Sequence, residues 1–411
     1  MINKERLWAR LTELSGIGKQ ESGGVTRFSF TREEREAKAL VSSYMTEAGM
    51  TVREDAVGNL IGKKEARQKN TPAVLMGSHI DTVLNGGMFD GALGVIAGIE
   101  VVHAMSERDI QPDHPIEVIA FTDEEGSRFG FGMIGSRAIA GTLTDKDLEQ
   151  RDENGITIAE AMEESGLDPK LVADAAKDPA DVKAYVELHI EQGRVLENHG
   201  LAAGTVSGIA GPLWMKWTIT GEAGHAGATP MNMRKDPLMA ASEIMQFIEG
   251  EAKKYPNLVA TIGRIAVKPG GVNVIPSEAT FTLDLRDIDE EIRQQAEEKM
   301  VAHAQQVCRD RGVEIEFETL QRVTPVPCSA VIRQTIQAAC LKLGLKSFEL
   351  PSGAGHDGMQ FKDFCPIGMV FVRSQNGISH NPEEWSTKED CGKGTEVLYE
   401  TVLSLVSGLE K

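Results

Sequence analysis

An apolar run, an apolar helical stretch and a second apolar run follow one another early in the chain. The runs are residues 73–77 and 116–121, and the stretch between them, residues 91–105, has the length and composition of a buried helix. Short, fully apolar runs are typical of strands that are buried on both faces. A strand, a helix and a strand in this order predict parallel strands of an α/β sheet.

The pattern changes near Gly208. Segments 214–220 and 279–286 alternate apolar and polar residues, which is typical of antiparallel strands with one exposed face. One helix is expected to begin at residues 236–237, where Asp precedes Pro, and a charged helix is expected over about 289–311. Strands and helices of this kind predict a small α+β layer.

The α/β pattern resumes near Pro325 and includes a helix expected over residues 330–343. A length of 411 residues fits two domains. We therefore expect an α/β fold whose larger domain, residues 1–210 and 326–411, has a mainly parallel sheet flanked by helices. An α+β domain with an antiparallel sheet, residues 211–325, is expected to be inserted into it.

The charge of the chain narrows the classes of partner. A formal net charge of -19 repels polyanions, so neither nucleic acid nor an acidic membrane surface is expected as a partner. The first residues are charged and lack the apolar stretch of a secretory signal. Five cysteines, an odd number with no CxxC pair, indicate reduced thiols rather than a disulfide framework. These features favour a cytoplasmic protein.

Five of the nine histidines lie in segments rich in glycine and acidic residues; they are His79, His189, His225, His356 and His380. His79 ends an apolar strand, where α/β proteins place ligand sites. The carboxylate of Asp81, two residues later, could accept the imidazole N–H and leave the other ring nitrogen free for a metal. Taken alone, this pattern favours a structural histidine over a metal ligand.

Acidic residues follow the two predicted strands. Asp90 lies in a glycine-rich loop at a helix start, where it could cap the helix, bind a metal, or do both. Glu124 and Glu125 follow the second strand in the run 122–126. Such a run is usually a solvated loop. Here, however, one glutamate could bind a metal while its neighbour, which points the other way, addresses a water molecule.

His189 and His380 add further nitrogen donors. His189 follows an apolar segment, and His380 lies in a loop that contains glycine. Imidazole and carboxylate ligands suit zinc, manganese, cobalt or nickel. A site for two such ions, ~3.5–4 Å apart, needs one carboxylate that both ions share, and it can turn a water molecule into a nucleophile.

Seven ordered motifs resemble one known family. The chain is similar over its whole length to the N-carbamoyl-L-amino acid hydrolase and allantoate amidohydrolase branch of a metallopeptidase clan that also holds zinc carboxypeptidases and aminoacylases. The motifs are GSHIDTVLNGGMFDGALGV, TDEEGSRF, ELHIEQG, GHAGATPM, GGVNVIP, PSGAGHD and GISHNPEEWS.

The resemblance implies two divalent metal ions, zinc or manganese, with cobalt or nickel as alternatives. It implies that Asp90 bridges them, that His79 and His189 complete one site, and that Glu125 and His380 complete the other. By the same resemblance, Glu124 is the general base that takes a proton from water, and Asp81 orients His79.

The inserted domain is implied to act as a lid and to form a homodimer. His225 is implied to donate to the oxyanion, and Asn273 and Arg286 to hold the substrate carboxylate. An ion pair with Asp284 or Asp287 is the alternative for Arg286. Whether His225 reaches the partner's active site stays open. Weaker expectations are that Gln192 and Gly355 contact the substrate and that His356 is structural.

The resemblance thus implies an amidohydrolase that removes the carbamoyl group from N-carbamoyl-L-amino acids, giving the amino acid, ammonia and carbon dioxide. Allantoate amidohydrolase is the first alternative. A dipeptidase or aminoacylase is disfavoured because His189 stands where many such enzymes carry an acid, and a non-catalytic binding protein is disfavoured because every ligand is present. The expected partner is a small ureido substrate with a carboxylate.

Overall fold

A computed structural model describes residues 1–407, which form two compact units. Within these residues, the first unit comprises residues 1–207, 328–350 and 356–407, and the second comprises residues 208–327 and 351–355. Within the described residues, no helix is both long enough and apolar enough to cross a lipid bilayer.

The first unit is built on one mixed sheet, whose strands lie in the order β1-β2-β4-β3-β5-β15-β6, and β14 also pairs with β6. The four central strands β4, β3, β5 and β15 are parallel, and the outer pairs are antiparallel. The expected parallel sheet flanked by helices is therefore confirmed. The strand bounds are β1 Thr51–Glu54, β2 Leu60–Lys64, β3 Ala73–His79, β4 Ile116–Phe121, β5 Val182–Ile190, β6 Ala203–Ile209, β14 Glu349–Ser352 and β15 Ile367–Val372.

Alternate residues of the central strands face opposite sides of this sheet. Val186 and Leu188 of β5 pack into the core formed with the long helices, whereas Tyr185 lies on the other side against Phe361. Helix α3 packs on β3 and β5, and α10 packs on β15 and α3. The helices are α1 Lys4–Leu14, α2 Arg32–Glu47, α3 Ala92–Ser106, α4 Ile134–Ile139, α5 Ile158–Glu164, α6 Val195–Asn198, α9 Ala330–Lys342 and α10 Lys388–Val406.

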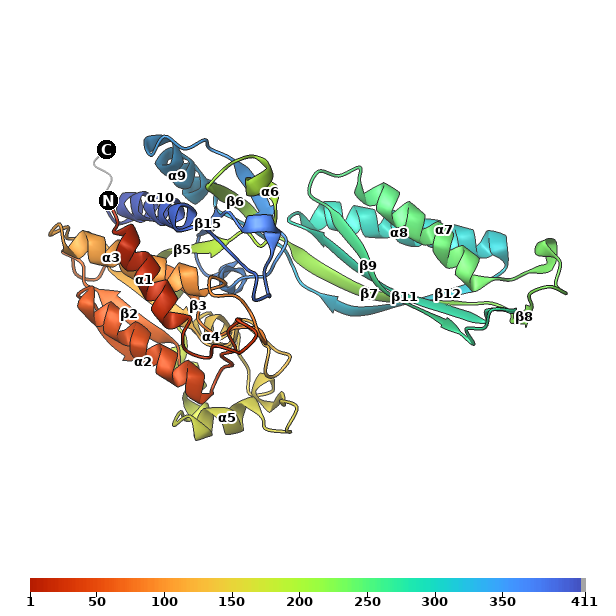
Figure 1. Cartoon of the computed structure of the whole chain (residues 1–411), viewed down its shortest axis with the longest axis horizontal. Coiled ribbons are helices and arrows are strands. Elements are labelled where there is room, and N and C mark those ends of the chain that lie inside the picture. The colour runs from red at the N-terminus through yellow and green to blue at the C-terminus, as the bar shows by residue number, and fades with distance from the viewer. Residues whose placement is uncertain (408–411) are drawn as a thin grey trace. The chain divides into compact units, whose positions relative to one another are not determined.

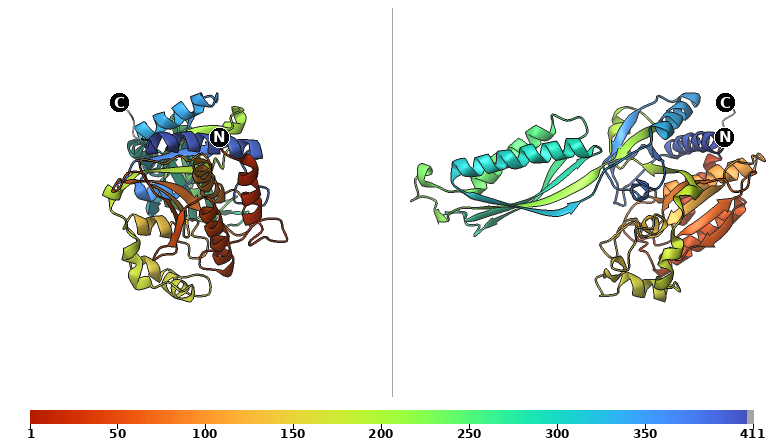
Figure 2. Two further views of the ribbon diagram at one scale, coloured as in Figure 1. Left: turned by 90° about the vertical axis from the view of Figure 1, so that its left-hand side faces the viewer. Right: turned by 180° about the vertical axis from the view of Figure 1, so that it is seen from behind.

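The second unit has a four-stranded antiparallel sheet in the order β12-β7-β11-β9. Helices α7 and α8 cover one face of this sheet, as Figure 1 and the right panel of Figure 2 show. The remaining elements are β7 Gly211–Thr220, β8 Gly224–His225, α7 Pro237–Ala252, β9 Val259–Lys268, β10 Val274–Ile275, β11 Glu278–Asp287, α8 Glu290–Arg311, β12 Glu314–Arg322 and β13 Val326–Pro327.

The alternation predicted for residues 279–286 is confirmed in β11. Phe281, Leu283 and Leu285 are buried beneath the helices, whereas Asp284 and Arg286 lie on the open face. The predicted start of α7 is also confirmed, because the Asp236 carboxylate accepts the N–H groups of residues 238 and 239.

Candidate metal centre

The two strand-end histidines lie on neighbouring strands of the first unit. His79 is the last residue of β3, and His189 is the last but one of β5, which pairs with β3 in parallel. Both side chains are 2% exposed, and the ring centroids are 6.0 Å apart. Because parallel strands end at the same edge of a sheet, the pairing of β3 with β5 brings these two rings together.

Asp90 lies among three imidazoles. Its Oδ1 is 3.1 Å from Nε2 of His189 and 4.0 Å from Nε2 of His79, and its Oδ2 is 3.2 Å from Nε2 of His380. The carboxylate is 6% exposed. Since each carboxylate oxygen faces a different histidine, this geometry is suited to a carboxylate shared between two cations.

The tautomers of the two buried histidines follow from their other ring nitrogens. Nδ1 of His79 lies 3.0 Å from the main-chain oxygen of Asp81, and Nδ1 of His189 lies 2.9 Å from that of Ile190. A carbonyl can only accept, so Nδ1 carries the hydrogen in both rings. Neutral rings would then aim Nε2 lone pairs at the Asp90 carboxylate. That arrangement is repulsive unless a proton or a metal cation lies between them.

Two glutamates complete the cluster. Glu124 Oε2 lies 3.7 Å from Nε2 of His79, and Glu125 Oε2 lies 3.7 Å from Nε2 of His380. Burial, followed by the charge of Glu125, raises the pKa of Glu124 well above its usual value. Burial and the charge of Asp90 raise the pKa of Glu125 to about 7. Divalent cations would relieve this crowding of negative charge, so the residues fit a metal centre.

Two of the three groups of candidate ligands in the described residues are the groups that the resemblance implies. One is His79, Asp90 and His189, and the other is Asp90, Glu125 and His380; the ligand atoms in each group lie within 4.8 Å of one another.

Asp81 differs from the expectation in what its carboxylate holds. The main-chain oxygen of Asp81 makes the close contact with His79, whereas its carboxylate is 3.6 Å from that ring. The two carboxylate oxygens instead accept the N–H groups of Glu124 and Glu125, each at 3.2 Å. The reason is the sharp turn at Asp123, whose φ of 55° points successive N–H groups toward Asp81.

The alternative that Asp90 caps the following helix is wrong. The N-cap of α3 is Gly91, and no side chain caps this helix. Gly91 has a φ of 63°, and a Cβ there would lie 2.4 Å from the ring of His79. Glycine is therefore required at this position for two reasons, and the Asp90 carboxylate stays directed at the histidines.

Gln192 and His356 both contact the cluster. Nε2 of Gln192 donates to Asp90 Oδ2 at 3.0 Å, which places this side chain beside the candidate ligands as expected of a substrate contact. The His356 ring stands edge-on to His189 with centroids 4.4 Å apart, and it is 1% exposed. Such burial favours a structural role for His356.

Sequence reasoning missed two buried carboxylates near the cluster. Glu187 groups with His189 and His356 and accepts hydrogen bonds from the hydroxyls of Ser78 and Tyr185 at 2.8 and 2.9 Å. The sequence did offer a signal for Glu187. It lies two residues before His189 on one strand, and residues with this spacing share a face of the sheet. The other, Glu384, lies four residues after His380 and contacts the Asp90 loop.

The candidate substrate contacts of the second unit fall into two places. Asn273 O accepts the N–H of Ala226, next to His225, so these residues lie together beyond the Thr220 end of β7. Arg286 pairs with Pro212 at the other end of the same sheet. The eight residue steps of β11 from Glu278 to Arg286 span ~27 Å. Asn273 and Arg286 of one chain therefore cannot hold the same carboxylate, contrary to expectation.

Arg286 forms the ion pair that the alternative interpretation expected. Its Nε and Nη2 donate to Asp284, with a closest distance of 2.8 Å, and its Nη1 donates to the main-chain oxygen of Gly353 at 2.7 Å. A guanidinium has five N–H donors, so two stay available for a ligand. Gly355 belongs to the same short segment, residues 351–355, of the second unit.

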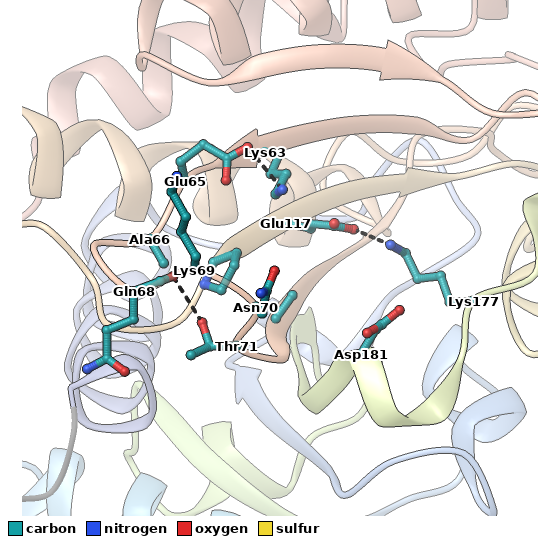
Figure 3. A pocket seen from close by; sticks show the side chains of 12 residues that line it. Lys63, Glu65, Ala66, Gln68, Lys69, Asn70, Thr71, Glu117, Lys177 and Asp181 are labelled. Atoms are coloured by element: carbon teal, nitrogen blue, oxygen red, sulfur yellow. Dashed lines mark hydrogen bonds and ion pairs between the residues drawn. The ribbon is translucent and has the colours of Figure 1, made fainter.

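A separate hollow of about 640 Å³ lies at the opposite edge of the first sheet (Figure 3). It is lined by Ala73 and Pro115, at the amino ends of β3 and β4. Two of its lysines form ion pairs within the hollow, Lys177 with Glu117 at 2.8 Å and Lys63 with Glu65 at 3.0 Å. Because it lies at the amino ends of strands whose carboxyl ends carry the histidines, this hollow is distinct from the histidine cluster.

The chain is similar to known proteins along most of its length. Residues 75–404 match the family described as "Peptidase family M20/M25/M40". The chain is 58% identical to the N-carbamoyl-L-amino acid amidohydrolase of Geobacillus stearothermophilus, over 99% of this chain and 100% of that protein. It is 35% identical to the allantoate amidohydrolase of Bacillus subtilis, over 95% of each.

A solved structure has the same fold. It is an amidase of the hydantoinase/carbamoylase family from Burkholderia multivorans, with a TM-score of 0.93 and 34% identity, and the match covers 99% of this chain and 98% of that one.

Proposed function

Because the chain belongs to peptidase family M20/M25/M40, we propose that it is a metal-dependent amidohydrolase acting on N-carbamoyl-L-amino acids. The products would be the amino acid, ammonia and carbon dioxide. The observation that carries the proposal is the Asp90 carboxylate held among three imidazoles. The substrate class rests on three relatives named as N-carbamoyl-L-amino acid amidohydrolases, at 58%, 46% and 38% identity.

Two divalent cations, zinc or manganese, would be held by the two groups of candidate ligands that share Asp90. When bound, such cations polarise a carbonyl and lower the pKa of water. Gln192 would help to hold Asp90 in place through its 3.0 Å hydrogen bond and would also contact the substrate.

Glu124 would act as the general base and acid. It lies beside the cluster without belonging to either ligand group, and the carboxylate of Asp81 fixes its main chain. Glu124 would take a proton from the attacking water and give it to the departing amine nitrogen, so that the C–N bond breaks without a free amide anion. The released carbamate then decomposes to ammonia and carbon dioxide.

Arg286 would bind the α-carboxylate of the substrate with the N–H donors that Asp284 and Gly353 leave available. A planar guanidinium favours carboxylates over neutral amides, which restricts the enzyme to amino-acid-like substrates. Main-chain N–H groups near Gly355 would add weaker contacts to the same substrate.

His225 would stabilise the oxyanion in the site of a second copy of the chain. The support is the ~27 Å of strand that separates the His225 end of the second unit from Arg286. One small substrate cannot contact both residues of one chain, so a homodimer would let His225 and Asn273 act on a substrate whose carboxylate Arg286 of the other copy holds. The five free cysteines suit the reducing cytoplasm, where we place the enzyme.

The test compares three substrates with manganese- or zinc-loaded protein: N-carbamoyl-L-methionine, allantoate and a simple dipeptide. Ammonia is measured for the first two and free amine for the third. Preference for the carbamoyl amino acid is expected. Preference for allantoate would make the chain an allantoate amidohydrolase with the same site, and absence of turnover with all three would contradict the proposal. An Asp90→Asn variant, assayed in parallel, controls for contaminating activity.

A further inference from the structure

Glu384 joins two loops that carry candidate cation ligands. This carboxylate is 3% exposed. Its Oε1 accepts the N–H groups of Phe89 at 2.9 Å and Asp90 at 3.1 Å, and its Oε2 accepts the hydroxyl of Ser379 at 2.9 Å. Ser379 directly precedes His380. A single buried side chain thus binds the loops of Asp90 and His380, which lie almost 300 residues apart in the sequence.

The loop before Asp90 packs directly on this carboxylate. A Cβ on Gly87 would lie 2.0 Å from Glu384 Oε1 and 2.5 Å from Glu384 Cβ. The backbone of Gly87 is outside the left-handed region. Glycine is therefore needed here because a side chain would not fit, and not because of the backbone conformation. The close approach lets the N–H groups of Phe89 and Asp90 reach Oε1.

Ser379 links the two carboxylates. Its hydroxyl is 3.1 Å from Asp90 Oδ2 and 2.9 Å from Glu384 Oε2, but it has only one proton to donate. Gln192 also donates to Asp90 Oδ2, at 3.0 Å. The hydroxyl can therefore bond to Glu384 while Asp90 keeps another donor.

We propose that Glu384 is a positioning residue for the candidate metal centre, which holds Asp90 and the Ser379–His380 loop in place before a cation binds. The inference rests on the proposed function. Glu384 bonds to main-chain N–H groups and a serine hydroxyl, so it acts through the ligands and does not touch substrate. Partners that orient metal ligands typically contribute 10–100-fold in metal affinity.

The experiment titrates manganese into chelator-treated protein by calorimetry and measures kcat and KM at saturating manganese. Glu384→Ala should weaken manganese binding by about 10–100-fold and lower kcat, with KM changed by less than about twofold. Glu384→Gln retains an oxygen that accepts the same N–H groups, so it should recover most of the affinity. The matched control is Glu383→Ala, which removes the same charge from an exposed neighbour and should behave as wild type.

Wild-type manganese affinity in a folded Glu384→Ala variant would overturn the inference. If that variant does not fold, Ser379→Ala decides: a loss of manganese affinity supports the inference, and an unchanged affinity overturns it. Failure of the proposed function is distinguishable, because the wild-type chain would then bind no manganese and release no ammonia.

Discussion

In the first unit the candidate ligands are mostly buried and hydrogen-bonded, whereas in the second unit the candidate substrate contacts lie at the surface. His79 and His189 are each 2% exposed, and their Nδ1 atoms are fixed by main-chain oxygens. His225 and Asn273 are exposed, and Arg286 is partly exposed. Among the first unit's candidate ligands, His380 is the exception, with half of its side chain exposed.

This difference separates two tasks. A buried polar group keeps its geometry because its hydrogen bonds are costly to break, so the first unit is organised for cations before they arrive. His225 and Arg286 also make hydrogen bonds within the second unit, but they lie at its surface, where a ligand can reach them. We infer that the first unit holds the metal centre and the general base, and that the second unit supplies the substrate contacts and the oxyanion donor.

The largest effect is expected for Asp90→Asn. A neutral amide removes the charge shared by both ligand groups, so the variant should lose both metal ions and all measurable turnover. Elemental analysis after dialysis, together with ammonia release, measures both quantities. A variant that still binds two ions would show that Asp90 is not the ligand shared between them.

Glu124→Gln should separate chemistry from metal binding inside the first unit. The amide cannot accept the proton of the attacking water, so kcat should fall by about 10²–10⁴-fold. Metal content should stay at the wild-type level, since Glu124 lies in neither ligand group. Parallel loss of metal and activity would instead identify Glu124 as a ligand.

Mixed dimers test the role of His225 in the second unit. His225→Asn alone should lower kcat by about 10²–10³-fold, as expected for loss of an oxyanion donor. Co-expression of the His225→Asn and Glu124→Gln chains, each with its own affinity tag, gives mixed dimers. If His225 acts across the dimer, one of the two sites in each mixed dimer has both native residues. Purified mixed dimers should then recover about half of the wild-type activity. Mixed dimers as inactive as the two parents would place both residues in one chain's site.

Arg286→Lys should affect recognition alone. An ammonium cannot bind a carboxylate through two parallel N–H groups, and hydrogen bonds to a charged group contribute about 1.5–3 kcal/mol. KM should therefore rise by about 10–100-fold while kcat and metal content change little. Steady-state kinetics with N-carbamoyl-L-methionine measure the split, and an unchanged KM would exclude Arg286 from substrate binding.

The smallest expected effect is a change in the stability of the metal-free protein with pH. Hydrogen bonds to Asp90 raise the pKa of His380 to about 9, and the pKa of His189 is also about 9 because the Asp90 carboxylate outweighs burial. Burial and the charge of Asp90 raise the pKa of Glu384 to about 7. The folded chain therefore binds these protons more tightly than the unfolded chain does.

Stability from the two histidines is consequently present below about pH 6.5 and is lost as the pH rises toward 9. The melting temperature of chelator-treated protein should fall over this range. Metal-loaded protein should show a smaller decrease, because cations replace the protons at the cluster. A flat profile for the metal-free protein would contradict the clustering of these groups.

Local pattern predicted much of the fold and part of the site. The alternation of residues in β11 predicted which side chains face the helices. The predicted ends of the strands indicated where His79 and His189 lie. No spacing rule pairs Asp90 with His380, which lie 290 residues apart and come together only in the folded chain. For that pairing the family resemblance was needed.

The misses have physical reasons. The carboxylates of Asp81 and Glu384 bond to main-chain N–H groups, and every residue type except proline supplies such a donor, so no sequence pattern reveals the partner. The separation of Asn273 from Arg286 was accessible, because the length of the predicted strand between them can be counted.

The most direct test of the central claim is anomalous diffraction from a crystal of the manganese- or zinc-loaded protein. Two peaks ~3.5–4 Å apart are expected on either side of the Asp90 carboxylate, one beside His79 and His189 and the other beside Glu125 and His380. A single peak, or a peak among Glu187, His189 and His356 in its place, would contradict the account.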